Sequence, residues 1–490
     1  MANPEIVMTG KGRLTRYLLR AVWAVAIITA TIVVIRAFDA RSLPDLHAWH
    51  EIRFDNEFDA DRDTDVDTFT DYVALEETVF DELDEKILGN TSGDRVTGAN
   101  RFDADSVYSS RNHDIDWNRT IELVPMQPRG TVLMLHGLTD SPYSMRSTAE
   151  LFFAQGYHVL VPRLPGHGTA PGGLLQAHWE DWQAVTKMGA THLRSGVDAD
   201  LPFVIVGYSN GGALAVNYAL DTLQDERLPR PDRLILMSPA IGLTPFAFFA
   251  SWNRTMSWIP YFEKFAWESV LPEYDPYKFN SFPKAAGNET YELAKRVQKR
   301  LARLQSSDDL ARMPPLLVFA PLVDSTVRTE ATADHLFVGL NRSQDELVLY
   351  DINRIEDMAQ FFRSEYKNLL QRLQTNEGRQ FRLTILRNRS SETQTVVVTS
   401  SQDNRSTTET IDADWPLGIY SMSHVAVPFP ATDSWYGDGR SPADDHVSLG
   451  RLNAYGEKNL LTVSPAQILR LRYNPFYDYQ ARRIDELLND

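Results

Sequence analysis

One junction constrains the fold of this chain more than any other part of it. Residues 203–216 read FVIVGYSNGGALAV, an apolar β-branched run followed by Ser209 between glycines and then by small and apolar residues. The run predicts a buried strand, and the residues after the glycines suit a helix. A Gly-x-Ser-x-Gly turn between a strand and a helix is so tight that neighbouring chain must approach without side chains, which leaves the serine exposed at the start of the helix. The pattern predicts that Ser209 is a nucleophile.

Strand and helix patterns alternate on both sides of this junction. We expect a strand at 130–137, a helix and a strand within 149–168, a helix over 179–194, and strands at 233–237 and 316–320. Strand, helix and strand at this spacing predict βαβ units. The predicted fold class is therefore α/β, with a mostly parallel sheet and helices on both of its faces.

Five motifs in this chain follow the order found in one superfamily. They are HGLTDSPYSM (136–145), RLPGHGTAP (163–171), GYSNGG (207–212), APLVDSTV (320–327) and MSHVAVP (422–428). Together they resemble the α/β-hydrolase superfamily, in the branch of monoacylglycerol lipases, carboxylesterases and serine-aminopeptidase-like lysophospholipases. The resemblance covers about residues 130–429 and implies an α/β-hydrolase fold with a helical lid. It also implies a serine hydrolase that works without a metal or cofactor.

A serine nucleophile needs a base, and the base needs a carboxylate to orient it. In this superfamily the chain order is Ser, then Asp or Glu, then His. Asp324 follows the apolar run PPLLVFAPLV and matches the family motif, and Asp351, after ELVLY, is the alternative acid. His424 follows the strand-like LGIYSM and matches the family motif, and His446, in DDHVSLG, is the alternative base. The predicted triad is Ser209, Asp324 and His424.

The resemblance also implies where the rest of the site lies. The oxyanion donors would be the backbone N–H groups of Leu138 and Asn210. Residues 245–267 contain nine aromatic residues among twenty-three, which predicts a lid with one face packed and the other lining an apolar pocket for an acyl or alkyl chain. The side chains expected to line that pocket are Phe248, Phe249, Trp252, Trp258 and Phe262.

The N-terminus carries a candidate membrane anchor. Residues 21–35, AVWAVAIITATIVVI, contain no charge and lie between Arg20 and Arg36. Together with residues 17–19 they approach the length of a membrane span if both arginines extend toward the headgroups. The segment has no A-x-A-like cleavage site at its end, which favours an uncleaved anchor. The basic residues before it would leave residues 1–16 in the cytoplasm and the catalytic domain outside, which would be the periplasm if the source is a Gram-negative bacterium.

The chain divides into seven expected segments. An acidic leader with an amphipathic helix over Phe69–Ile87 follows the anchor, and the hydrolase core is interrupted by a lid and by an insertion. The insertion is expected because more residues separate Asp324 from His424 than is usual in this branch. The segments are 1–42 (N-terminus and anchor), 43–129 (leader), 130–243 (first half of the core), 244–310 (lid), 311–356 (second half of the core), 357–412 (insertion) and 413–490 (histidine strand and C-terminal helix).

Composition narrows the function further. The net charge of −17 argues against a nucleic-acid partner, and the absence of cysteine excludes disulfides, thiolate metal sites and a cysteine nucleophile. We predict a membrane-anchored hydrolase that cleaves small-molecule or lipid carboxylic esters through an acyl-enzyme on Ser209. One alternative is a peptidase of the same fold, in which Glu263, Glu268 or Glu273 would hold a free amino group. The other is a binding module without catalysis. The oligomeric state is not predicted.

Overall fold

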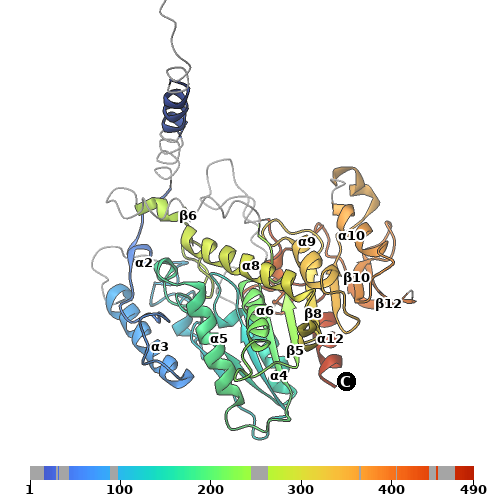
Figure 1. The fold of residues 1–490 in the computed structure, drawn as a ribbon, viewed down its shortest axis with the longest axis horizontal. Coiled ribbons are helices and arrows are strands. Elements are labelled where there is room, and N and C mark those ends of the chain that lie inside the picture. The colour runs from blue at the N-terminus through green and yellow to red at the C-terminus, as the bar shows by residue number, and fades with distance from the viewer. Residues whose placement is uncertain are drawn as a thin grey trace, which may run out of the picture.

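A computed structural model describes residues 16–28, 31, 43–88, 98–243, 263–362, 366–403, 405–440, 448–450 and 469–489. In this described part, ten strands form one sheet in the order β1-β3-β2-β4-β5-β8-β9-β10-β11-β12 (Figure 1). The strands are β1 (Ile121–Leu123), β2 (Gly130–Leu135), β3 (Tyr157–Val161), β4 (Phe203–Tyr208), β5 (Arg233–Met237), β8 (Leu316–Pro321), β9 (Glu346–Tyr350), β10 (Arg382–Asn388), β11 (Thr395–Gln402) and β12 (Arg405–Asp414).

The pairing of these strands confirms a mostly parallel sheet. Parallel pairing joins each strand to the next along the run β3, β2, β4, β5, β8, β9 and β10. β1 pairs antiparallel with β3 at one edge, and β11 and β12 add an antiparallel hairpin at the other. The helices are α2 (Ala48–Glu51), α3 (Phe69–Leu83), α4 (Arg146–Ala154), α5 (Trp179–Arg194), α6 (Asn210–Thr222), α8 (Lys284–Leu304), α9 (Thr329–Thr332), α10 (Tyr366–Gln374) and α12 (Tyr477–Asn489).

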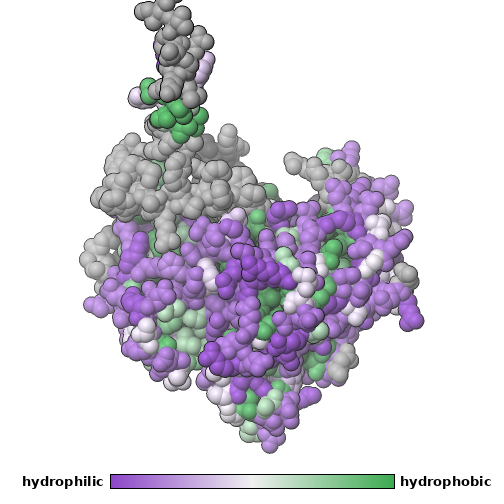
Figure 2. Space-filling model, in the orientation of Figure 1, coloured by the Kyte–Doolittle hydropathy of each residue, from purple (hydrophilic) through white to green (hydrophobic). Residues whose placement is uncertain are grey.

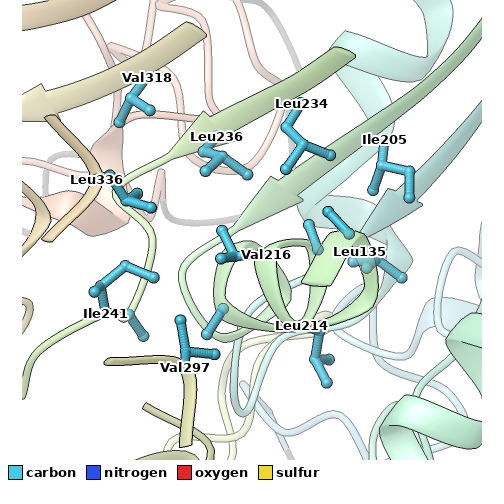
Figure 3. Packing of buried hydrophobic residues seen from close by; sticks show 14 of the residues in the cluster. Leu135, Ile205, Leu214, Val216, Leu234, Leu236, Ile241, Val297, Val318 and Leu336 are labelled. Atoms are coloured by element: carbon cyan, nitrogen blue, oxygen red, sulfur yellow. The ribbon is translucent and has the colours of Figure 1, made fainter. Parts of the chain in front are cut away.

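Helices cover both faces of the sheet because alternate strand residues are buried on opposite sides. Leu234 and Leu236 belong to the core on one face, where α5, α6 and α8 pack (Figure 1). Ile235 and Met237 belong to the core on the other face, which α4 and α12 cover. Figure 3 shows Leu234 and Leu236 projecting from the sheet toward α6. Burying one such side chain stabilises the fold by about 1.5–3 kcal/mol.

The acidic leader packs on the hydrolase core through a buried ion pair. The guanidinium of Arg163, on the loop after β3, donates to Glu57 at 2.9 and 3.0 Å and to Glu76 of α3 at 3.2 Å. Arg163 is fully buried, and Glu57 and Glu76 are nearly so. The hydroxyl of Tyr72 donates to the carbonyl of Arg163 at 2.6 Å. The same helix buries Phe69, Val79 and Leu83 of the apolar face that its sequence spacing predicts, so the described residues of the leader form part of the body of the molecule.

Residues 357–412, the segment expected to be an inserted subdomain, add strands to the central sheet. β10 pairs in parallel with β9, and β11 and β12 follow as a hairpin, so the segment extends the central sheet. The segment before the candidate base also differs from expectation, because residues 415–423 are irregular and His424 begins a short 3₁₀ turn. From β12 at the edge of the sheet, the irregular segment returns to the loop after β8, where His424 contacts Asp324.

The predicted lid, residues 244–310, is described from residue 263 onward. Two short strands, β6 (Trp267–Ser269) and β7 (Phe282–Pro283), pair antiparallel and lead into α8. Leu293, Val297 and Leu301 of α8 are buried in the same core as α6. α8 is therefore part of the hydrolase body. The five aromatic residues expected in the acyl pocket lie outside the described residues.

The predicted anchor lies partly outside the described residues. Residues 16–28 are helical and stand away from the body of the molecule in Figure 1. Their apolar side chains, among them Val22 and Ile27, are exposed. Figure 2 shows hydrophobic residues on this helix. Within the part of the chain that is described, no helix is long and apolar enough to cross a membrane.

Candidate active site

Ser209 occupies a sharp turn between β4 and α6. Its backbone has φ 51° and ψ −112°, a conformation that residues with a side chain rarely adopt and that marks strain at a functional position. Its N–H donates to the carbonyl of Met237 at 2.9 Å, and its own carbonyl accepts from Ala240 N–H at 2.8 Å. These bonds tie the turn to the last residue of β5 and to the loop that follows it.

The glycines around Ser209 are required by close packing. A Cβ atom on Gly207 would lie 2.5 Å from the carbonyl oxygen of Gly211, and one on Gly212 would lie 2.7 Å from Pro239. A Cβ on Gly211 would collide with the carbonyl of Leu135 at the end of β2. The turn thus packs closely on itself, on the end of β2 and on Pro239. This close approach is what the sequence motif predicts.

His424 and Asp324, which lie one hundred residues apart in the sequence, are joined by hydrogen bonds. His424 Nδ1 donates to Asp324 Oδ2 at 2.9 Å, and the backbone N–H of His424 donates to the same oxygen at 2.6 Å. The other oxygen, Oδ1, accepts from the N–H groups of Thr326 and Val327 at 2.7 Å each. Burial alone would raise the pKa of Asp324, but the charge of His424 and these hydrogen bonds outweigh it and hold that pKa well below its usual range.

The alternative residues stand elsewhere. Asp351 accepts two hydrogen bonds at 2.7 Å from the guanidinium of Arg354, with which it forms an ion pair. It therefore has a partner of its own, and Asp324 is the carboxylate that contacts His424. His446, the alternative base, lies outside the described residues.

A pocket of about 430 Å³ opens at the carboxyl ends of the strands. Ser209 and His424 both line it, together with Leu138 from the loop after β2. Thr139, next in that loop, has φ 65°, and its carbonyl accepts from Phe279 N–H at 2.8 Å, which holds the loop in place. Asn210 is the first residue of α6, and its side chain is fully buried. The predicted oxyanion residues therefore flank the turn on which Ser209 sits.

Of the three acids weighed for a peptidase, Glu268 lines the pocket. Glu273 is fully buried, where its carboxylate accepts from the N–H groups of Asn280 and Ser281 at 2.9 and 2.8 Å. Burial raises the pKa of Glu273 to about 7. Glu263 is exposed at the start of the described part of the lid. One of the three is thus placed to meet a ligand.

Sequence reasoning missed the cations of this pocket. Lys278, Lys284 and Arg470 line it beside Ser209 and His424. These residues belong to none of the family motifs. Lys278 comes from the segment before α8, Lys284 is the first residue of α8, and Arg470 comes from the segment before α12. The short run RLRYNP at residues 470–475, with its two arginines, is the one local signal that could have drawn attention to Arg470.

Comparison with known families decides the membership of the chain. The model of the alpha/beta hydrolase family matches residues 132–379, just over half of the chain. The chain belongs to this family. Ser209 and Asp324 lie inside the matched part of this α/β hydrolase, whereas His424 lies after it.

Curated relatives of this α/β hydrolase cover parts of its length. A thermostable monoacylglycerol lipase from Bacillus sp. (strain H-257) is 25% identical over 217 residues, which are 44% of this chain and 79% of the relative. The phospholipase YtpA from Bacillus subtilis (strain 168) is 27% identical over 117 residues, 24% of this chain and 43% of the relative.

Solved structures are also similar to this α/β hydrolase. The structure of a metagenome-derived lipolytic enzyme, from work on LipS and LipT, has 23% identity and a TM-score of 0.38, and covers 48% of this chain and 88% of its own. The monoacylglycerol lipase of Paleococcus ferrophilus has 18% identity and a TM-score of 0.36, and covers 51% of this chain and 98% of its own.

Proposed function

We propose that this α/β hydrolase cleaves carboxylic esters through an acyl-enzyme on Ser209. The observation that carries the proposal is the hydrogen-bonded pair of His424 and Asp324 beside the pocket that Ser209 also lines. Family membership and curated relatives that are a monoacylglycerol lipase and a phospholipase support an ester-hydrolysing enzyme. A binding module without catalysis would have no need of the strained turn at Ser209.

The proposed chemistry moves one proton at a time through His424. Nε2 of His424 takes the proton of Ser209 Oγ as this oxygen attacks the ester carbonyl, while Asp324 holds Nδ1–H and stabilises the imidazolium. The backbone N–H groups of Leu138 and Asn210 stabilise the oxyanion. The proton then passes to the alcohol oxygen as the C–O bond breaks. Water attacks the acyl-enzyme with His424 again as base, and the carboxylic acid leaves as Ser209 regains its proton.

The nucleophile is tested by replacing Ser209 with alanine. Ser209→Ala should abolish fluorophosphonate labelling and ester turnover, while the thermal midpoint stays nearly unchanged because one exposed hydroxyl contributes little to stability. Ser269→Ala is the matched control, because Ser269 lines the same pocket but lies on β6 rather than in the turn. It should still be labelled. Labelling that persists in Ser209→Ala would overturn the assignment.

The preference for the length of the acyl chain is tested with p-nitrophenyl acetate, butyrate and octanoate. If the predicted lid residues line an apolar pocket, each buried CH₂ contributes up to about 0.8 kcal/mol, so kcat/KM should rise up to about fourfold per CH₂ until the pocket is full. Trp252→Ala or Trp258→Ala should flatten the rise and spare the acetate. Efficient cleavage of aminoacyl anilides together with weak ester turnover would instead favour the peptidase.

We also propose that residues 17–35 attach the chain to a membrane, with the hydrolase domain outside the cytoplasm. The support is the uncharged run of residues 21–35 and the basic residues that precede it. Deleting residues 1–40 should move esterase activity from the membrane fraction to the soluble fraction. A reporter fused to the C-terminus of the full chain should read extracytoplasmic. A cytoplasmic reporter signal would contradict the proposed topology.

A further inference from the structure

A smaller hollow adjoins the pocket that holds Ser209. It has a volume of about 110 Å³, and Arg472, Tyr436 and Asp140 are among its lining residues. Lys278 and Arg470 line both this hollow and the larger pocket. The two spaces therefore share a wall that carries positive charge, in a chain whose net charge is −17.

Two of these cations already have carboxylate partners. Lys278 Nζ lies 2.7 Å from Asp140, which is nearly buried. Arg472 lies 3.4 Å from the fully buried Asp275, and it also donates to the hydroxyl of Tyr274 at 3.3 Å. Their charges are compensated within the protein.

Arg470 is different. Its guanidinium contacts the hydroxyl of Thr326 at 3.3 Å and Nδ1 of His424 at 3.4 Å. Nδ1 already donates to Asp324, so it offers Arg470 no lone pair. In the part of the chain that the structure describes, no carboxylate lies within ion-pair distance of Arg470. A half-buried guanidinium without an anionic partner loses hydration without compensation, and an oxyanion with two acceptor oxygens would supply that compensation.

The position of Arg470 also indicates which part of a substrate it would meet. The leaving alcohol receives its proton from Nε2 of His424, and Arg470 contacts Nδ1 of the same ring and lines the pocket that Ser209 also lines. An anionic group on the alcohol part of an ester would thus come close to the guanidinium. Among the described residues that line the larger pocket, Glu268 is the one carboxylate, and it is exposed on β6. Lys278 in this pocket is already paired with Asp140, so the charge that favours an anion here is that of Arg470.

We propose that Arg470 forms a subsite for an oxyanion on the alcohol part of the ester substrate. The substrate class is then an acyl ester of an alcohol that carries a phosphate or a carboxylate. This inference rests on the proposed ester hydrolysis and names the substrate class of that same site.

The test compares three butyryl esters that differ in the alcohol part: 1-butyrylglycerol, 1-butyrylglycerol 3-phosphate and the butyryl ester of glyceric acid. Butyrate release by the full chain is followed at constant pH. The wild type should have a higher kcat/KM for at least one charged ester than for the neutral one, and the ester preferred shows whether phosphate or carboxylate is recognised. Arg470→Gln should lower the charged-to-neutral ratio of kcat/KM roughly 10- to 100-fold, mainly through KM, because a charge-assisted hydrogen bond is lost.

Two further variants separate recognition from folding. Arg470→Lys keeps the charge and should retain much of the ratio. Arg227→Gln is the control, because Arg227 is exposed and pairs with Asp225. Its charged-to-neutral ratio of kcat/KM should equal that of the wild type. Hydrolysis of the neutral ester with no preference for a charged one, or an unchanged ratio in Arg470→Gln, would overturn the subsite while leaving the proposed function intact. If the enzyme hydrolyses none of the three esters, both the subsite and the proposed function are overturned.

Discussion

Asp324 shows how much of the site depends on the partners of a single side chain. Each carboxylate oxygen accepts two hydrogen bonds, and two of these four bonds come from His424. Asp351 ends the next apolar run, so the two acids look alike in the sequence, and the family motif is what favoured Asp324. The ion pair between Asp351 and Arg354 separates them in the structure. Which acid meets the histidine depends on a contact across one hundred residues, and this distance explains why local sequence left an alternative open.

The first prediction compares these two acids. Asp324→Asn should lower kcat/KM by about 10⁴-fold, since the amide neither holds the required tautomer of His424 nor stabilises its cation. Asp351→Asn should lower the thermal midpoint through the weakened pairing with Arg354 and leave kcat/KM close to the wild-type value. Steady-state ester hydrolysis and thermal unfolding of both variants check this. A loss of activity in Asp351→Asn with an active Asp324→Asn would reverse the assignment.

At the scale of elements, the turn between β4 and α6 depends on missing side chains. Gly207→Ala would place a methyl group 2.5 Å from the carbonyl oxygen of Gly211, which should cost about 1–3 kcal/mol of unfolding free energy and displace Ser209. Gly378→Ala is the control, because the nearest atom to its new methyl is 3.6 Å away. The thermal midpoint and the rate of ester turnover should both fall in Gly207→Ala. Both should stay at wild-type values in Gly378→Ala. Equal stability of the two would contradict the packing argument.

The elements themselves were largely predictable, because alternating burial leaves a period in the sequence. The strands around Ser209 follow the expected order, and α3 lies where apolar spacing indicated a helix. The place of β10, β11 and β12 was not predictable. Their strand pattern is visible, but whether such strands extend a sheet or form a separate unit depends on pairing with β9, which no local pattern encodes.

At the scale of the whole molecule, the leader and the hydrolase core share one body. Trp49, Phe54 and Phe58 of the leader are buried, and Glu57 forms an ion pair with the fully buried Arg163. The partners of this ion pair are 106 positions apart. An acidic stretch is usually solvated, so composition alone indicated a leader and missed the buried pair. Removing one partner of such a pair leaves the charge of the other partner buried and uncompensated.

Two truncations test this integration. Deleting residues 1–40 should leave a folded, active enzyme. Deleting residues 1–97 should give a protein that aggregates or unfolds at a much lower temperature, because Arg163 loses Glu57 and Glu76 and apolar core surface is exposed. The point variant Glu57→Gln should lower the unfolding free energy by about 3–5 kcal/mol without removing any chain. A stable and active enzyme lacking residues 1–97 would show that the leader is dispensable.

The central claim, that Ser209 carries the acyl group while His424 serves as base, is tested most directly by mass spectrometry of the acyl-enzyme. The full chain with His424→Ala is incubated with p-nitrophenyl butyrate, digested and analysed for peptides heavier by one butyryl group. Loss of the base should slow both acylation and deacylation, so a long incubation should accumulate the adduct on the peptide that contains Ser209, and Ser209→Ala should carry none. An adduct on a different residue, or wild-type turnover in Ser209→Ala, would contradict the account.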